Sequence, residues 1–247
     1  MLLAIDIGNT NIVFALFEGK KIVKSWRAVT GSGDYKMSQD EAAKVTDIIV
    51  SSVVPAEDNK LRRYCRENLS CDPLFVEAKH TGLTIDLDKP EEIGADRLVN
   101  AVAVLQEYSA PAIVIDFGTA TTFDVITSKG HYAGGAIAPG VNLSLEALER
   151  AAAKLPDIEI KRPKNVIGKN TVEAMQSGIY WGYVGLIEGL IGKITDEMGV
   201  DPFIIATGGL APLFAPAIPA IKKIDGELTL KGLRRIHEAR KANRQAA

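Results

Sequence analysis

Ala4-Ile5-Asp6-Ile7-Gly8-Asn9-Thr10-Asn11, near the start of the chain, has a close counterpart in Val114-Ile115-Asp116-Phe117-Gly118-Thr119-Ala120-Thr121-Thr122. Each stretch runs from an apolar, strand-like segment through an aspartate and a glycine into small hydroxyl or amide residues. Glycine permits a tight turn whose backbone N–H groups point outward, and small polar side chains leave room for a phosphate. An aspartate at a strand end can hold a cation, directly or through water. Two such turns in a chain of 247 residues predict two related lobes that hold one nucleotide phosphate chain between them.

Taken alone, the first turn, Asp6 to Asn11, is explained as well by an ordinary hairpin turn in which Asp and Asn make local hydrogen bonds. The second copy, with Asp116, Gly118, Thr119 and Thr121, makes the phosphate-binding explanation the better one for both turns. Convergent polar groups that recur in one local frame favour a binding site over two unrelated turns.

Composition narrows the class of protein. Hydrophobic residues make up 47% of the chain and charged residues 24%, which is typical of a globular protein. The net charge of −2 provides no electrostatic footprint for nucleic acid or an anionic membrane surface. Cys65 and Cys71 match no metal-binding spacing, which favours a reducing, cytoplasmic setting. No apolar run approaches the roughly 18 residues of a membrane span, and Asp6 interrupts the apolar start too early for a signal peptide.

The pattern of apolar residues predicts an α/β fold with two lobes, residues 1–95 and 96–247, each a mixed sheet flanked by helices. The expected strands are Leu2–Asp6, Ile12–Phe17, Lys21–Arg27, Asp47–Val53, Leu74–Val76, Ala112–Asp116, Thr122–Ile126, Ala133–Ile137 and Phe203–Ala206. The expected helices are Gln39–Lys44, Asn59–Asn68 on the surface, Arg97–Tyr108 entering the second lobe, Leu143–Ala153, Thr171–Ile194 and Leu230–Lys241 with a basic solvent face. Thr30–Asp40 and Asp86–Glu92 are expected to be loops.

Gly208 and Gly209 follow the predicted strand Phe203–Ala206. A glycine pair there lets a flat ring approach the backbone, as an adenine site requires. By itself the pair is better explained by a strand-to-helix turn that needs a positive φ. Together with two phosphate turns, the adenosine interpretation is favoured.

Gly94-Ala95-Asp96-Arg97 stands at the start of a predicted helix, between the two turns. One interpretation is structural: Asp96 caps the helix or lies in its first turn, with Arg97 as a solvent-screened partner. The other is catalytic. A carboxylate within hydrogen-bond reach of an alcohol can take its proton as a phosphoryl group arrives, and Arg97 would orient that carboxylate or face substrate oxygens.

Five glycines recur at spacings of four and three on one face of the predicted helix Thr171–Ile194: Gly178, Gly182, Gly185, Gly189 and Gly192. Each costs about 0.5–1 kcal/mol relative to alanine in a helix interior. So many weak helix formers on one face indicate close packing against another backbone. Packing within one subunit and packing across a dimer axis are equally compatible with the pattern. His80, His131 and His237 share no metal-ligand spacing and are expected on the surface or in loops.

The motifs together resemble those of the type III pantothenate kinases, within the superfamily of acetate and sugar kinases, heat-shock ATPases and actin. The matching segments run in family order over nearly the whole chain: Asp6-Ile7-Gly8-Asn9-Thr10, Ser51-Ser52-Val53-Val54-Pro55, Gly94-Ala95-Asp96-Arg97, Asp116-Phe117-Gly118-Thr119-Ala120-Thr121, Gly134-Gly135-Ala136-Ile137-Ala138-Pro139-Gly140, Lys154-Leu155-Pro156, Thr171 with Ser177-Gly178, Ala206-Thr207-Gly208-Gly209 and Leu228-Thr229-Leu230. Short pieces such as DxGN are weak alone, whereas the full set with GADR is highly specific.

The resemblance implies two ribonuclease-H-like lobes with a nucleotide cleft between them. It implies ATP-dependent phosphorylation of pantothenate to 4′-phosphopantothenate, the first committed step of coenzyme A synthesis, by a bacterial, cytoplasmic homodimer. Asp96 would be the catalytic base. The implied ATP-binding residues are Asp6, Ile7, Gly8, Asn9, Thr10, Asn11, Ile12, Val13 and Thr119, joined by Gly208 and Gly209. Mg²⁺ would bridge the phosphates, with Asp6 reaching it through water, and Asp116 would hold K⁺ or NH₄⁺.

The implied substrate-binding residues are Gly94, Ala95, Asp96, Arg97 and Thr171. The sequence departs from the family in two places. Leu87 stands where the family usually has a tyrosine that lines the pantothenate site, and the segment Thr30–Lys44 is shorter than usual. Two rival functions remain: another small-molecule kinase of the superfamily, which would lack GADR here, and a non-enzymatic regulatory protein, against which the complete acid and phosphate set argues.

Overall fold

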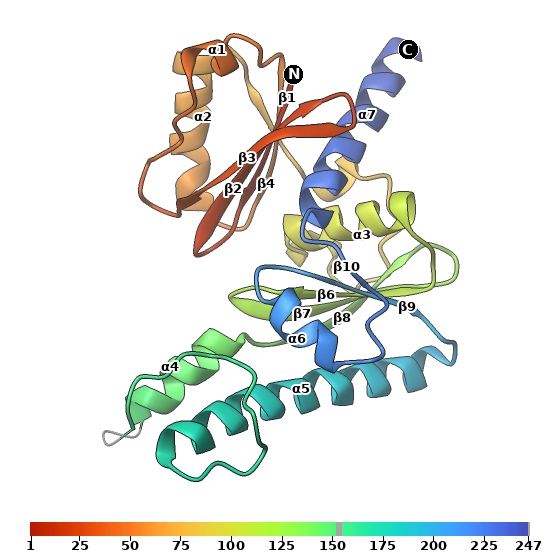
Figure 1. The fold of residues 1–247 in the computed structure, drawn as a ribbon. Coiled ribbons are helices and arrows are strands. Elements are labelled where there is room, and N and C mark those ends of the chain that lie inside the picture. The colour runs from red at the N-terminus through yellow and green to blue at the C-terminus, as the bar shows by residue number, and fades with distance from the viewer. Residues whose placement is uncertain (152–154, 247) are drawn as a thin grey trace. The chain divides into compact units, whose positions relative to one another are not determined.

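The computed structural model describes residues 1–151 and 155–246. It divides into two compact units (Figure 1). The first comprises Met1–Tyr108 together with the segment that begins at Glu227, and the second is Ser109–Gly226. No helix in the described part of the chain combines the length and the apolar character that a membrane crossing requires.

The first unit is built on a five-stranded mixed sheet of order β3-β2-β1-β4-β5. Its strands are β1 (Leu2–Ile7), β2 (Asn11–Glu18), β3 (Lys21–Val29), β4 (Asp47–Ser52) and β5 (Pro73–Phe75). Strands β1, β2 and β3 are antiparallel, whereas β4 and β5 run parallel to β1. Its helices are α1 (Gln39–Ala42), α2 (Pro55–Leu69), α3 (Ala95–Glu107) and α7 (Leu228–Ala246), with short 3₁₀ turns at Ala78–His80 and Pro90–Glu92.

Side-chain alternation along β1 explains how the helices cover this sheet. Leu3, Ile5 and Ile7 point to one face and pack with buried residues of α2. Leu2 and Ala4 point to the other face and pack with buried residues of α3 and α7. Successive side chains of a strand point to opposite faces, so Asp6 shares the face of Leu2 and Ala4.

The second unit repeats this topology with order β10-β9-β6-β7-β8. Strands β6, β7 and β8 are antiparallel, and β9 and β10 run parallel to β6. Its elements are β6 (Ala112–Phe117), β7 (Ala120–Ile126), β8 (Tyr132–Pro139), α4 (Val141–Ala151), α5 (Thr171–Met198), β9 (Phe203–Thr207), α6 (Ala211–Phe214), a 3₁₀ turn Ala215–Ala217 and β10 (Lys223–Ile224). Ile113, Ile115 and Phe117 pack with Tyr180 and Ile187 of α5 in the core of this unit. The predicted α/β class, with two mixed sheets flanked by helices, is confirmed.

Several predicted bounds need correction. Helix α2 starts at Pro55 rather than Asn59, because proline is well suited to a first helical position. It is also not purely a surface helix, since Leu61, Cys65 and Leu69 are buried. Strand β10 and helix α6 were not predicted, because two and four residues are too short to carry a periodic signal. The end of the predicted helix Leu143–Ala153 and the motif residue Lys154 lie outside the described residues.

The division into units also differs from the expected boundary between residues 95 and 96. Helix α3, expected in the second lobe, belongs to the first unit, and so does α7 at the end of the chain. The cause is packing, because both helices contribute to the core on one face of the first sheet: Val99 and Val102 from α3, and Leu230, Leu233 and Ile236 from α7.

Helices α3 and α7 approach each other very closely. A Cβ atom added to Gly232 of α7 would lie 2.2 Å from the carbonyl oxygen of Val99 in α3. Thr229 of α7 also donates a hydrogen bond to Asn100 Oδ1 of α3, at 2.8 Å. Only a residue without a side chain fits at position 232.

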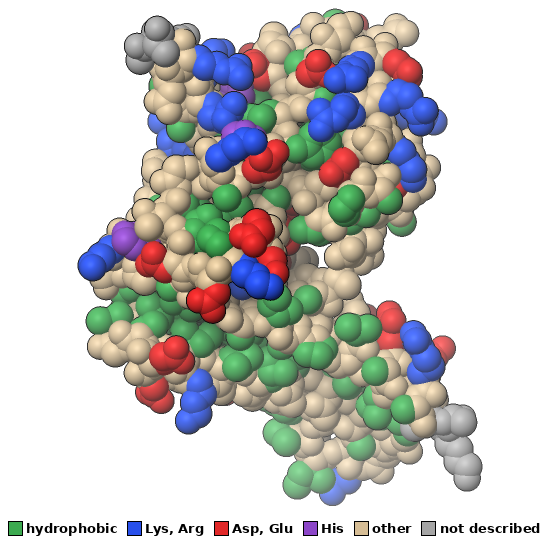
Figure 2. Space-filling view, turned by 180° about the vertical axis from the view of Figure 1, so that it is seen from behind, with side chains coloured by type: hydrophobic (Ala, Val, Ile, Leu, Met, Phe, Trp, Pro, Cys, Tyr) green, Lys and Arg blue, Asp and Glu red, His purple; other side chains and the backbone are tan. Residues whose placement is uncertain are grey.

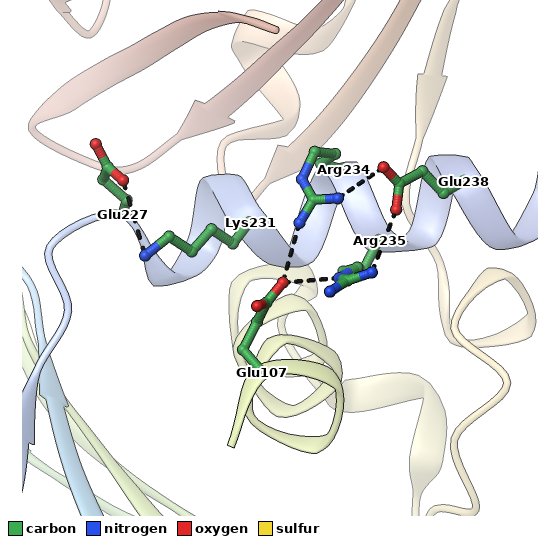
Figure 3. A network of polar contacts seen from close by, with 6 residues as sticks. All are labelled: Glu107, Glu227, Lys231, Arg234, Arg235 and Glu238. Atoms are coloured by element: carbon green, nitrogen blue, oxygen red, sulfur yellow. Dashed lines mark hydrogen bonds and ion pairs between the residues drawn. The ribbon is translucent and has the colours of Figure 1, made fainter. Parts of the chain in front are cut away.

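Charged residues extend this contact toward the end of α3 (Figure 3). Glu107 Oε1 accepts from Arg234 at 2.9 Å and from Arg235 at 2.7 Å, and Arg234 also reaches Glu238 at 2.6 Å. Arg234 is only 4% exposed, so its charge needs these partners. The basic solvent face predicted for this helix therefore holds for part of it only, because Arg234 is turned inward.

Gly232→Ala should force α7 away from α3. Overpacking of this kind typically costs about 1–3 kcal/mol. The free energy of unfolding from urea titration checks this. Gly226→Ala is the matched control, because a Cβ atom there meets nothing within 4 Å. Equal stability of the two variants would contradict the close helix contact.

Candidate active site

The turn between β1 and β2 is held by backbone and side-chain hydrogen bonds. The N–H of Gly8 donates to the carbonyl of Asn11 at 3.0 Å, and the hydroxyl of Thr30 donates to the carbonyl of Gly8 at 2.7 Å. Asn9, Thr10 and Asn11 are exposed at its tip. The turn therefore presents polar groups on a fixed backbone, as a phosphate site requires.

Not every residue predicted to bind ATP has a side chain at the surface. Ile7 and Ile12 are buried in the core beside α2, and Val13 packs against the core beside α3 and α7. Their side chains hold the turn to the sheet, so only their backbone groups remain for a ligand.

Asp6 and Asp96 influence each other electrostatically. Asp6 lies on the sheet face that α3 covers, and Asp96 lies in the first turn of α3. The pKa of Asp6 is raised from 3.8 to about 7. Burial of the carboxylate is the larger cause, and the negative charge of Asp96 is the second. Two carboxylates brought together in this way favour a protonated partner or a bound cation.

Asp96 is not the helix cap. Gly94 occupies that position and supplies no side-chain hydrogen bond. Asp96 Oδ1 instead accepts from the backbone N–H of Arg97 at 2.8 Å, and a Cβ atom on Gly94 would lie 2.6 Å from that oxygen. Burial raises the pKa of Asp96, although the N–H and the charge of Arg97 partly oppose the shift. A raised pKa is what a carboxylate needs to act as a base near neutral pH.

A surface hollow of about 590 Å³ lies beside Gly94 and Ala95. Its lining comes from the end of β4, the segment after β5, the turn at Pro90 and the start of α3: Ser52, Val53, Val76, Glu77, Ala78, Lys79, Pro90, Glu91, Ile93, Gly94, Ala95 and Leu98. The predicted substrate residue Leu87 is half-buried in an irregular segment and is not among these lining residues.

In the second unit, oxygen atoms gather around two glycines. Gly208 has a φ of +89°, and a Cβ atom there would lie 2.5 Å from Asp116 Oδ1 and 2.6 Å from the carbonyl of Phe117. A Cβ atom on Gly140 would lie 2.2 Å and 2.7 Å from the carbonyls of Thr119 and Gly118. The second turn and the glycine after β9 therefore meet. Gly208 also has the positive φ that the structural interpretation requires.

Two further residues of this region were not predicted as site residues. Gly140 follows Pro139 and lies against the turn. The motif of residues 134–140 contains it, but that motif did not indicate a contact with the turn. Tyr183 of α5 is buried and shares a hydrogen bond with Thr121. Its pKa is raised mainly by burial, and the negative charge of Asp116 also contributes to the rise. A tyrosine that points into a core has no distinctive sequence pattern.

Thr171 is the first residue of α5 and is exposed. Asn170 caps the helix by accepting from the N–H of Glu173 at 2.9 Å. Among the predicted residues, the first unit thus holds Asp6 to Val13 and Gly94 to Arg97, and the second holds Asp116, Thr119, Thr171, Gly208 and Gly209.

Across residues 1–151 and 155–246, no group of three or more His, Cys, Asp or Glu side chains is arranged to hold a metal ion. A divalent cation on one protein carboxylate takes its other ligands from water and from substrate phosphates, as Mg²⁺ commonly does. Asp6 at the end of β1 fits that pattern.

The repeated mixed sheets, each with a glycine turn after its first strand, define a protein of the ribonuclease-H-like fold class. Comparison with known proteins gives the family: the model of the type III pantothenate kinases matches residues 2–193. A type III pantothenate kinase of Paramagnetospirillum magneticum is 54% identical, with 96% of each chain covered. This chain belongs to the type III pantothenate kinase family.

Solved structures share the fold at low identity. A Campylobacter jejuni protein described as a member of the Baf family of transcriptional activators aligns with a TM-score of 0.68 and 19% identity, over 97% of this chain and 99% of that one. MreB 5 of Spiroplasma citri, bound to AMPPNP, aligns with a TM-score of 0.54 and 10% identity, over 99% and 98%. At these identities the likeness concerns the fold alone.

The raised pKa of Asp6 makes the stability of the ligand-free protein depend on pH. The folded state holds the Asp6 proton more tightly than the unfolded chain, so stability falls as pH rises from about 4 to about 7. Asp6→Asn removes this penalty. It should be more stable than wild type at pH 8 by about 1–3 kcal/mol, a range reduced for the partial exposure of the side chain. Urea unfolding at pH 4 and pH 8 measures the difference, which should shrink toward pH 4. A pH-independent difference would contradict the shift.

Proposed function

We propose that this enzyme transfers the γ-phosphoryl group of ATP to the hydroxyl of pantothenate, giving 4′-phosphopantothenate and ADP at the start of coenzyme A synthesis. Family membership over nearly the whole chain supports the reaction. The observation that carries the mechanism is the Asp96 carboxylate, held by the Arg97 N–H at the start of α3, beside a hollow and with a raised pKa.

In this proposal Asp96 accepts the proton of the pantothenate hydroxyl, whose oxygen then bonds to the γ-phosphorus while the bond to the ADP oxygen breaks. The hydrogen bond from Arg97 fixes the orientation of the carboxylate without neutralising it. The raised pKa makes Asp96 a stronger base than an exposed aspartate. Gly94 to Arg97, together with Thr171, contact pantothenate.

The phosphates of ATP bind at Asp6 to Val13 and at Thr119, and Gly208 and Gly209 accommodate the adenosine. Mg²⁺, when bound, would neutralise part of the negative charge of the phosphates. Asp6 would hold it through water, which also relieves the cost of its charge beside Asp96. The proposal includes the cytoplasmic location that the family resemblance implies.

Asp116 is proposed to bind a monovalent cation, K⁺ or NH₄⁺. Asp116 Oδ1 and the carbonyl of Phe117 lie close to Gly208, and the carbonyls of Gly118 and Thr119 lie close to Gly140. Carboxylate and carbonyl oxygens are the ligands that hard cations prefer. A cation bound there would balance the negative charge of the Asp116 carboxylate.

The function is tested by measuring ADP release with MgATP and pantothenate, against glucose and N-acetylglucosamine as acceptors. Each reaction is run in K⁺ buffer and in Na⁺ buffer of equal ionic strength. Turnover with pantothenate that depends on K⁺ supports the proposal. Turnover with a sugar alone would assign another kinase activity, and no ATP turnover with any acceptor would favour a regulatory protein.

Asp96→Asn should retain ATP binding and lose phosphoryl transfer, because an amide cannot accept the hydroxyl proton. Removal of a positioned base typically lowers kcat by about 10²- to 10⁴-fold. Steady-state kinetics measure kcat, and calorimetry measures nucleotide affinity in the same samples. Asp88→Asn, a change of the same chemistry at an exposed position, is the control. Near-wild-type turnover of Asp96→Asn would exclude Asp96 as the base.

The homodimer is proposed to pack in part through the glycine face of α5. Gly178, Gly182, Gly185, Gly189 and Gly192 are all exposed, and a Cβ atom at any of them meets nothing within 4 Å. Close packing against the described residues of the same chain, one of the two explanations for these glycines, therefore does not occur. Val172, Val166 and Ile167, at the start of α5 and just before it, are exposed as well. Hydrophobic side chains also gather over the second unit on the face seen in Figure 2.

Gly182→Leu and Gly185→Leu should weaken the dimer by separating helices that approach through their backbones. Sedimentation velocity at micromolar concentration measures association, and the kinase assay runs in parallel. Gly182→Ala is the matched control and should perturb association much less. A wild-type monomer at that concentration would refute the dimer, and dimers that tolerate both leucines would place the interface elsewhere.

A further inference from the structure

We propose that Thr30, at the end of β3, is a positioning residue for ATP: it clamps the first phosphate turn through two hydrogen bonds to the backbone of that turn. The inference rests on the proposed function, since it concerns how that turn meets a phosphate. Thr30 lies outside the phosphate-turn and GADR motifs, and no phosphate contact is required of it.

The geometry involves both polar groups of Thr30. Its hydroxyl donates to the carbonyl of Gly8 at 2.7 Å, and its backbone N–H donates to the carbonyl of Thr10 at 3.0 Å. The turn is closed independently by the N–H of Gly8, which donates to the carbonyl of Asn11 at 3.0 Å. Two carbonyls of the four-residue turn are therefore held by one residue that directly follows β3.

Holding a carbonyl also aims the N–H that follows it. A peptide bond is planar and trans, so the N–H of Asn9 points opposite to the carbonyl of Gly8. The Thr30 hydroxyl draws the Gly8 carbonyl toward β3, which directs the Asn9 N–H away from β3. The same reasoning applies to the Thr10 carbonyl and the Asn11 N–H. Preorganised N–H groups bind a phosphate without first losing conformational freedom.

The segment that carries Thr30 is itself anchored. The backbone N–H of Gly31 bonds to the carboxylate of Glu57 in α2, a side chain only 3% exposed. Glu57 also accepts from Lys60 at 2.7 Å and from the hydroxyl of Tyr35 at 2.5 Å. A clamp needs a support that does not move with the ligand, and α2 packs into the core of the first unit.

A purely structural role of Thr30 would lower stability without affecting the KM for MgATP more than the KM for pantothenate. The test therefore measures the two KM values separately. Thr30→Val removes the hydroxyl and keeps the β-branched shape, whereas Thr30→Ser keeps the hydroxyl. Thr46→Val is the matched control: its hydroxyl bonds to Asp47 Oδ2 at 2.9 Å in the same unit, away from the turn. KM and kcat are measured for MgATP at saturating pantothenate, and KM for pantothenate at saturating MgATP.

Loss of one hydrogen bond between neutral groups should raise the KM for MgATP of Thr30→Val about 3- to 10-fold. The KM for pantothenate should stay within twofold, Thr30→Ser should restore the wild-type value, and Thr46→Val should not differ from wild type. An unchanged KM for MgATP in Thr30→Val would overturn the proposal, and so would an equal rise in both KM values. If Thr30→Val does not fold, Thr30→Ala replaces it with the same criteria.

A ligand-free measurement separates this inference from the proposed function. Amide exchange followed by NMR should be faster at Gly8 in Thr30→Val than in wild type or Thr30→Ser, because the turn that its N–H closes is loosened. If the wild type does not phosphorylate pantothenate, the proposed function fails. The role of Thr30 is then still tested by the exchange rate at Gly8 and by the calorimetric affinity for MgATP. Unchanged exchange together with unchanged nucleotide affinity would overturn it.

Discussion

Side-chain alternation along β1 is the constraint on which the first unit depends. It sends Leu3, Ile5 and Ile7 into the core beside α2, and Leu2 and Ala4 into the core beside α3 and α7. Asp6 must then project toward the face that carries α3, whose first turn holds Asp96. A shift of one residue in this strand would turn Asp6 toward α2 and would turn Leu3, Ile5 and Ile7 toward α3 and α7.

The carboxylates that result are costly to the ligand-free protein. Burial and the charge of Asp96 raise the pKa of Asp6 to about 7, and burial raises that of Asp96. Helix α3, which carries Asp96, is held against α7, where Gly232 meets the backbone of Val99 and Glu107 accepts from Arg234 and Arg235. Arrangements of this kind trade stability for function, since a bound cation reverses the penalty.

The two units share one topology but differ in the surroundings of their first turns. In the first unit, the turn after β1 is clamped from β3 and exposes Asn9, Thr10 and Asn11. In the second, Gly208 lies close to Asp116 Oδ1 and the carbonyl of Phe117, and Gly140 lies close to the carbonyls of Gly118 and Thr119. The first turn leaves polar residues exposed, whereas the second lies close to carbonyl and carboxylate oxygens.

The sequence alone predicted the repeated strand–turn–strand order, the two-sheet class and the family, because period-2 apolar runs and glycine turns are local signals that survive without tertiary contacts. It did not predict that α3 and α7 belong to the first unit, that Asp6 and Asp96 share one face, or that Thr30, Gly140 and Tyr183 support the turns. Those features depend on contacts between residues far apart in the chain, such as Gly232 with Val99 and Thr30 with Gly8. No local sequence pattern specifies such contacts, so they became visible only in the tertiary structure, where the strands, turns and helices pack together.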